Sequence, residues 1–147
     1  MDGLEIIKEA NKAKDMFSAK LVGFSKLHST PIQITLSEKW TKGKAASGGP
    51  CNNESFYGVF LNPIVINQRF GEYSISGEDQ KKYVQYLTCH ELAHMFTWKV
   101  QQQFENKYFV SENTSEIADL ITDEIVIAAF PEFKKFAENE YAGRYHL

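Results

Sequence analysis

The first half of the chain changes from a helical to a strand pattern of hydrophobic positions. Apolar residues recur at near-helical spacing over Leu4–Phe17, with lysines between them, which predicts an amphipathic helix. After Pro31, apolar and polar residues alternate over Ile32–Leu36, as is typical of a half-buried strand. The segment Lys39–Asn53 has glycines and small polar residues without a period, so it predicts a loop near the cleft.

Strand-like segments and a long helix are predicted next. Phe56–Leu61 and Ile64–Asn67 are rich in β-branched and aromatic residues, and the intervening Asn-Pro pair predicts two strands or one interrupted strand. Ser76, with an acid three residues later, predicts the N-cap of a helix that runs to about Glu105.

The C-terminal part predicts two more helices. Asn113, Thr114 and Ser115 offer N-caps for a helix that reaches Phe130. Pro131 then marks the end of that helix or the first turn of a last helix. Because no repeat or domain boundary is visible, we expect one compact α+β domain over residues 1–147, with further helices after the long helix.

Composition narrows the class of protein. A chain of 147 residues with 43% hydrophobic and 24% charged residues is typical of one globular domain. The net charge of -3 argues against a strongly basic surface for nucleic acid. The apolar run Ile125–Phe130 is too short to cross a bilayer, and Met1–Lys14 lacks the pattern of a secretory signal. Cys51 and Cys89 form no CxxC pair, so we expect a reducing, cytoplasmic setting and no membrane partner.

The chemistry is concentrated in one motif inside the long predicted helix. His90, Glu91 and His94 form HExxH, in which histidines four positions apart project from one side of a helix and can share one Zn²⁺. Glu91 is rotated by about 100° from His90, so it can act as general base on a metal-bound water without binding the metal. Such a site hydrolyses peptide bonds. The alternative is a pair of core histidines beside a surface glutamate.

A third protein ligand is expected, because hydrolytic zinc sites keep three protein ligands and one open position. His28 lies in a turn region, and His146 is the penultimate residue. We therefore predict Glu116, 22 positions after His94, as the third ligand. Glu112 and Asp119 remain open as alternatives.

Asp119 and Asp123 share the helical face of Glu116, so one acid could bind zinc while another orients a histidine. The alternative for Glu116 is a capping box begun by Asn113, with the two aspartates on the solvated side of an amphipathic helix.

The sequence resembles the zincin metalloproteases. Cys51–Trp98, with VFLNPIVIN before YLTCHELAHMFTW, looks most like an SprT-like metallopeptidase domain. That resemblance implies a small sheet paired with the zinc helix, and proteolysis that often acts on proteins bound to DNA. SprT-like domains usually supply a third histidine, which is missing between His94 and His146. The segment Ser115–Asp119 instead looks like the glutamate helix of gluzincins, in which an acid or Asn follows the ligand by four positions. Leu120 occupies that place here.

The sequence thus predicts a zinc-dependent endopeptidase acting on protein or peptide substrates. Tyr57, Tyr141, Tyr145 and His146 are candidates for stabilising the oxyanion. The segment Tyr57–Asn67 could form the cleft edge and pair with an extended substrate.

The sequence is also compatible with two alternative functions. One is a zincin-fold protein that holds a protein partner without turnover, against which the intact Glu91 counts. The other is a protease directed to nucleic acid through lysines of the first helix and of the Lys39–Lys44 loop, which the acidic balance makes the weaker choice. The oligomeric state is not predicted.

Overall fold

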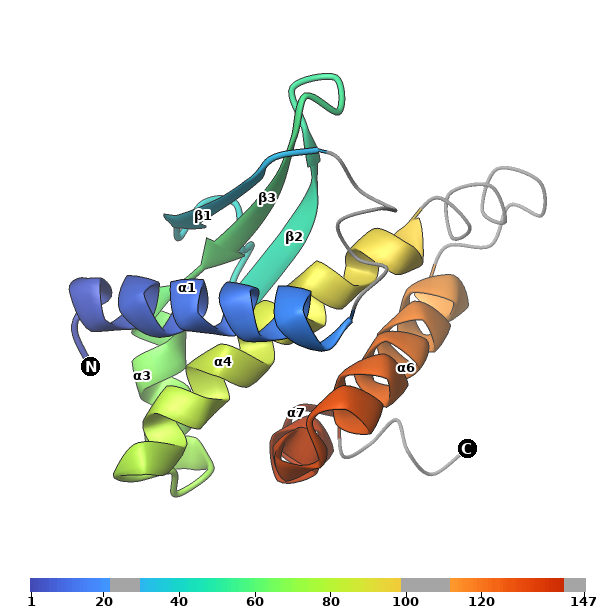
Figure 1. Cartoon of the computed structure of the whole chain (residues 1–147). Helices are drawn as coiled ribbons and strands as arrows, with labels where there is room; N and C mark the ends of the chain where they lie inside the picture. The colour runs from blue at the N-terminus through green and yellow to red at the C-terminus, as the bar shows by residue number, and fades with distance from the viewer. Residues whose placement is uncertain (22–29, 99–111, 142–147) are drawn as a thin grey trace.

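The computed structural model describes residues 1–21, 30–98 and 112–141, and for residues 112–116 and 141 it describes the backbone alone. Within these ranges a three-stranded sheet lies against helices in an α+β arrangement, as the sequence predicts (Figure 1). The helices are α1 (Gly3–Lys20), α3 (Pro63–Glu72), α4 (Glu78–Ala93), α6 (Glu112–Ala129) and α7 (Lys134–Tyr141), with the 3₁₀ turns η1 (His94–Phe96) and η2 (Pro131–Phe133). The strands are β1 (Ile32–Leu36), β2 (Ala46–Cys51) and β3 (Phe56–Leu61).

Strand β3 is the centre of the sheet. It pairs in parallel with β1, where Val59 lies opposite Ile34, and antiparallel with β2, where Val59 lies opposite Gly48. Both edges of β3 are therefore occupied. The prediction that Tyr57–Asn67 forms the cleft edge is wrong, and β2 is the edge strand on the side of α4.

Strand β2 lies in the segment that was predicted to be a loop. The main-chain N–H of Asn62 donates to the carbonyl of Ala45 at 2.9 Å, which sets the antiparallel alternation. Residues 45, 47, 49 and 51 then bond to β3, whereas 46, 48 and 50 face away from it. Pro50 falls in the outward set, so its missing N–H costs the sheet no hydrogen bond.

The second predicted strand, Ile64–Asn67, is part of helix α3 instead. Asn62 caps this helix, since its side-chain oxygen accepts hydrogen bonds from the main-chain N–H groups of Ile64 and Val65. Pro63 occupies the first turn, where its fixed φ favours a helix. The Asn-Pro pair is thus a helix start, and this signal outweighs the β-branched residues that follow it.

Helix α4 begins and ends differently from its prediction. Gly77, with φ +61°, precedes it, and Ser76 does not act as the N-cap. The helix ends at Ala93 and continues as η1. The motif therefore lies at the C-terminal end of α4 rather than at its centre. The remainder of the predicted helix, up to Glu105, extends outside the described residues.

Helix α4 forms the middle of the structure. It packs against α1, β2, β3 and α6, and its residues from Tyr83 to Ala93 are all buried (Figure 1). The face that carries the motif, with Tyr83, Tyr86, Leu87 and Ala93, therefore points inward, and burial extends around the whole helix. This packing fixes the motif between the sheet and α6.

The remaining elements follow the prediction closely. The first helix and the first strand are confirmed as α1 and β1, and Pro131 separates α6 from the last helix. The proposed caps Asn113–Ser115 lie inside α6, which already includes Glu112. Both cysteines are free. Within the described ranges, no helix has the length and apolar character needed to cross a membrane.

Candidate metal centre

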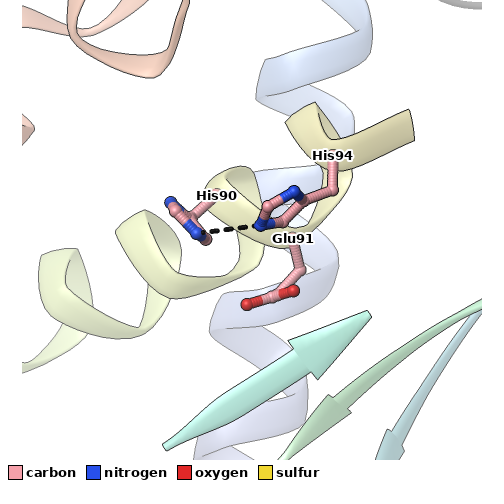
Figure 2. A group of neighbouring side chains, drawn as sticks. All are labelled: His90, Glu91 and His94. Atoms are coloured by element: carbon pink, nitrogen blue, oxygen red, sulfur yellow. Dashed lines mark hydrogen bonds between the residues drawn. The ribbon is translucent and has the colours of Figure 1, made fainter. Parts of the chain in front are cut away.

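Two histidines and one aspartate converge on a single point between α4 and α6. The Nε2 atoms of His90 and His94 lie 3.1 Å apart, and Figure 2 shows the two rings directed toward one another. The Oδ1 atom of Asp119 lies 3.2 Å from His90 Nε2 and 3.1 Å from His94 Nε2. These three atoms form a nearly equilateral triangle.

The triangle has the dimensions of a tetrahedral zinc site. Zinc bonds to imidazole and carboxylate ligands are about 2.0–2.1 Å long, which places tetrahedral ligand atoms about 3.3 Å apart. The three sides of 3.1–3.2 Å are close to that separation. Because imidazole lone pairs and a carboxylate oxygen repel one another, this convergence requires a proton or a cation among them. The residues present therefore fit a zinc ion.

Helix α6 also orients both histidines through their other ring nitrogens. His90 Nδ1 lies 2.7 Å from Asp123 Oδ1, and His94 Nδ1 lies 3.3 Å from Thr122 Oγ1. The Thr122 hydroxyl donates its hydrogen to the carbonyl of Ala118 at 2.6 Å, so it accepts from His94. These partners place the Nδ1 proton on each neutral ring and leave both Nε2 lone pairs directed at the triangle.

Charged groups in and around the triangle shift its pKa values strongly. Burial lowers the pKa of His90, but hydrogen bonds to Asp119 and Asp123 outweigh burial and raise it to about 10. Burial also raises the pKa of Asp119, whereas hydrogen bonds from His90 and His94 outweigh it and hold that pKa well below the usual range of a carboxyl. The site thus stabilises positive charge at the position where a metal would bind.

Glu91 lies on the other side of the histidine pair, next to the sheet. Figure 2 shows its carboxylate directed toward β2, and one of its oxygens lies within 4.8 Å of a ring nitrogen of each histidine. A Cβ atom placed on Gly48 would lie 3.0 Å from Glu91 Oε2 and 3.1 Å from Glu91 Cβ, so a larger residue at this position would require Glu91 to shift. The Tyr57 hydroxyl donates to the Glu91 carbonyl at 2.9 Å, at the helix end where carbonyls lack partners. The sheet therefore holds both the backbone and the side chain of Glu91.

A cleft opens onto these residues. Its volume is about 420 Å³, and the segment leading into β2 forms one wall. The other walls come from α4, α6, α3 and α7, and the lining residues are Gly43–Gly48, Arg69, Leu87, His90, Glu91, His94, Asp119 and Glu140. The triangle and the Glu91 carboxylate are accessible from this cleft.

The structure brings together His90, Glu91 and His94, as predicted, and adds Asp119 from among the predicted alternatives. Glu116 and Glu112 lie on α6, but their side chains are outside the described part, so their role as ligands stays a prediction.

Of the candidates for stabilising the oxyanion, Tyr57 has a side chain that the structure describes. Tyr57 is 2% exposed, and its hydroxyl is engaged with Glu91, which leaves it no free donor for an oxyanion. His28, Tyr145 and His146, and the side chain of Tyr141, lie outside the described residues.

Sequence reasoning missed Thr122 and Gly48. The glycine pair before Pro50 was the one signal for a close approach of the backbone at Gly48. Nothing in the local sequence marks Thr122, because its partner His94 is 28 positions away.

No family model, curated protein or solved structure matches this chain. The resemblance to SprT-like domains and gluzincins therefore stays a prediction, and the functional argument depends on the geometry. The gluzincin pattern, in which an acid follows the ligand by four positions, fits one of the two candidate ligands. Counted from Asp119 rather than from Glu116, an acid does follow by four positions, at Asp123.

Proposed function

We propose that this protein is a zinc-dependent endopeptidase in which His90, His94 and Asp119 bind the metal and Glu91 is the general base. The observation that carries the proposal is the triangle of three donor atoms with sides of 3.1–3.2 Å. When bound, a zinc ion lowers the pKa of a coordinated water and polarises the substrate carbonyl.

Glu91 supplies the proton transfer. Its carboxylate lines the cleft beside the two histidines, although the residue is only 8% exposed. A water molecule in the cleft can therefore transfer a proton to it. The same carboxylate then delivers that proton to the leaving amine. Gly48 and Tyr57 fix the position of Glu91 before the reaction, which reduces the cost of orienting it.

Strand β2 offers a place for an extended peptide. It is an edge of the sheet, it borders the cleft through Ala46, Ser47 and Gly48, and the backbone groups of residues 46 and 48 face away from β3. A peptide that pairs with this edge would run past Glu91 and the two histidines. Pro50 carries no N–H and limits that pairing to the first part of the strand.

The decisive experiment combines metal analysis with the variant Glu91→Gln. We expect purified protein to contain about one zinc per chain, and the variant to keep that zinc while losing hydrolysis of unfolded protein by about 10²–10⁴-fold. Equal activity in the variant and the wild type would refute the enzyme proposal. A zinc-loaded wild type without turnover on any substrate would instead indicate the protein-holding function.

The remaining predictions from the sequence concern setting and partners. A substrate bound to nucleic acid and a cytoplasmic location both stay predictions. DNA-bound and free protein substrates therefore belong in the same assay. Cleavage that depends on DNA and falls steeply with salt would favour the nucleic-acid-directed protease.

A further inference from the structure

The cleft continues along α4 to a second charged group, away from the metal triangle. Its lining extends from His90 past Leu87 to Arg69 on α3 and Glu140 on α7. Tyr83, seven residues before His90 on α4, donates a hydrogen bond to the Glu140 carboxylate. Seven residues of α-helix span about 10 Å. Glu140 therefore lies in the same cleft as the triangle, toward the N-terminal side of His90 along α4.

Negative charge is in excess at this end of the cleft. Arg69 Nη1 bonds to Glu72 Oε2 at 2.7 Å, whereas Arg69 Nε lies 3.8 Å from Glu140 Oε1. Among the residues that the structure describes, one guanidinium thus faces two carboxylates at this end of the cleft. Glu140 has a side-chain exposure of 13% and is held by a neutral phenol, Tyr83. Burial and the negative charge of Glu140 raise the pKa of both Tyr83 and Tyr73.

The surface between the two ends is apolar at Leu87, which is 6% exposed and lies one helical turn before Glu91. Such a surface suits the methylene stem of a lysine or arginine side chain, whose charged end then reaches a polar group. The other cation of the lining, Lys44, belongs to the segment that leads into β2.

We infer that Glu140 makes this protein select a lysine or arginine side chain next to the scissile peptide bond. The inference rests on the proposed endopeptidase function. A lysine side chain reaches about 6 Å from Cα to Nζ, and the reacting carbon lies roughly 3 Å beyond the attacking oxygen. Such a side chain is long enough to extend from a peptide at the triangle along the cleft toward Glu140. A charged hydrogen bond there is stronger than one in water, because the carboxylate is largely shielded.

The test uses peptides that differ only in the residue on either side of the cleavage site. Lysine, norleucine and glutamate are compared, since norleucine keeps the stem and removes the charge. We expect kcat/KM for the lysine peptide to exceed that for norleucine by about 10–100-fold, the range of a hydrogen bond to a charged group. Glu140→Gln keeps an acceptor for Tyr83 and should reduce this ratio to near one.

The matched control is Glu138→Gln, which removes the same charge from α7 at a side chain that is 61% exposed. This control should retain the wild-type ratio. A ratio that survives Glu140→Gln, or a wild-type preference for norleucine or glutamate, would overturn the inference.

Measurements of peptide binding distinguish a failure of this inference from a failure of the proposed function. Peptide dissociation constants are measured in the Glu91→Gln background, with and without Glu140→Gln. Tighter binding of the lysine peptide that depends on Glu140 supports the selection even if no peptide is cleaved. Equal binding of lysine and norleucine peptides would refute it even if the enzyme is active.

Discussion

Asp123 should control metal affinity without touching the metal. Its side chain is fully buried, and its Oδ1 atom accepts from His90 Nδ1 at 2.7 Å and from the Tyr86 hydroxyl at 3.0 Å. The carboxylate makes the imidazole a better donor and fixes the ring orientation. Asp123→Asn preserves the shape and one acceptor oxygen but removes the negative charge.

The expected loss follows from the contact of Asp123 with the Nδ1 atom of His90. Replacing a carboxylate that orients a metal-binding histidine costs about 10–100-fold in metal affinity, or about 1.4–2.7 kcal/mol. Asp123→Ala should also destabilise the fold, since it leaves the His90 N–H and the Tyr86 hydroxyl without this buried partner. Each such group costs about 1–3 kcal/mol when it is left unsatisfied.

Zinc affinity would be measured by competition with a chromogenic chelator, and stability by thermal unfolding of the metal-free protein. Glu124→Gln is the matched control, because it removes the same charge from the next position of α6, where the side chain is exposed. We expect this control to bind zinc as the wild type does. Unchanged affinity in Asp123→Asn, or an equal loss in Glu124→Gln, would refute the assignment of Asp123.

Two further predictions test the sheet contact and the charge of the site. Gly48→Ala places a Cβ 3.0 Å from Glu91 Oε2, so kcat should fall by about 10²-fold, as expected for a misplaced base, with zinc content unchanged. Gly49→Ala meets no atom within 4 Å and should stay active; equal loss in both variants would contradict the contact. In metal-free protein the pKa of His90 is raised from 6.5 to about 10, so its stabilising charge is fully present below pH 6.5 and is lost as the pH rises through about 10. The Tm of chelator-treated protein should therefore fall over this range, and a flat profile would contradict the shift.

The sequence predicted the parts of the site that depend on short-range spacing. His90, Glu91 and His94 lie within one turn of a helix, so their relative directions follow from the helical period. The position of Gly48 beside Glu91 depends instead on how β2 packs against α4, 43 positions further along the chain. The glycine pair before Pro50 permits a close approach but does not identify its partner, because a glycine in a loop and a glycine at a close contact look alike in sequence.

The errors at α3 and β2 have different causes. The start of α3 was encoded locally, in Asn62 and Pro63, but the β-branched residues that follow favoured a strand. Strand β2 carries two glycines and a proline, and it forms because β3 provides a partner for alternate backbone groups. In β2, pairing with β3 thus outweighs the low strand propensity of glycine and proline. In α3, the capping signal of Asn62 and Pro63 outweighs the strand propensity of the residues that follow.

Residue spacing alone does not distinguish the two candidates for the third ligand. Glu116 and Asp119 are three positions apart on α6, so both lie on nearly the same face and both satisfy the spacing after His94. Asp119 has the shorter side chain, and its Oδ1 completes the triangle at 3.1–3.2 Å from both Nε2 atoms. We therefore expect Asp119→Ala to lose bound zinc and Glu116→Ala to retain it, as measured by elemental analysis of dialysed protein. The opposite result would return the ligand to Glu116 and leave Asp119 as a hydrogen-bond partner of the histidines. Full zinc in both variants would contradict a carboxylate ligand at either position.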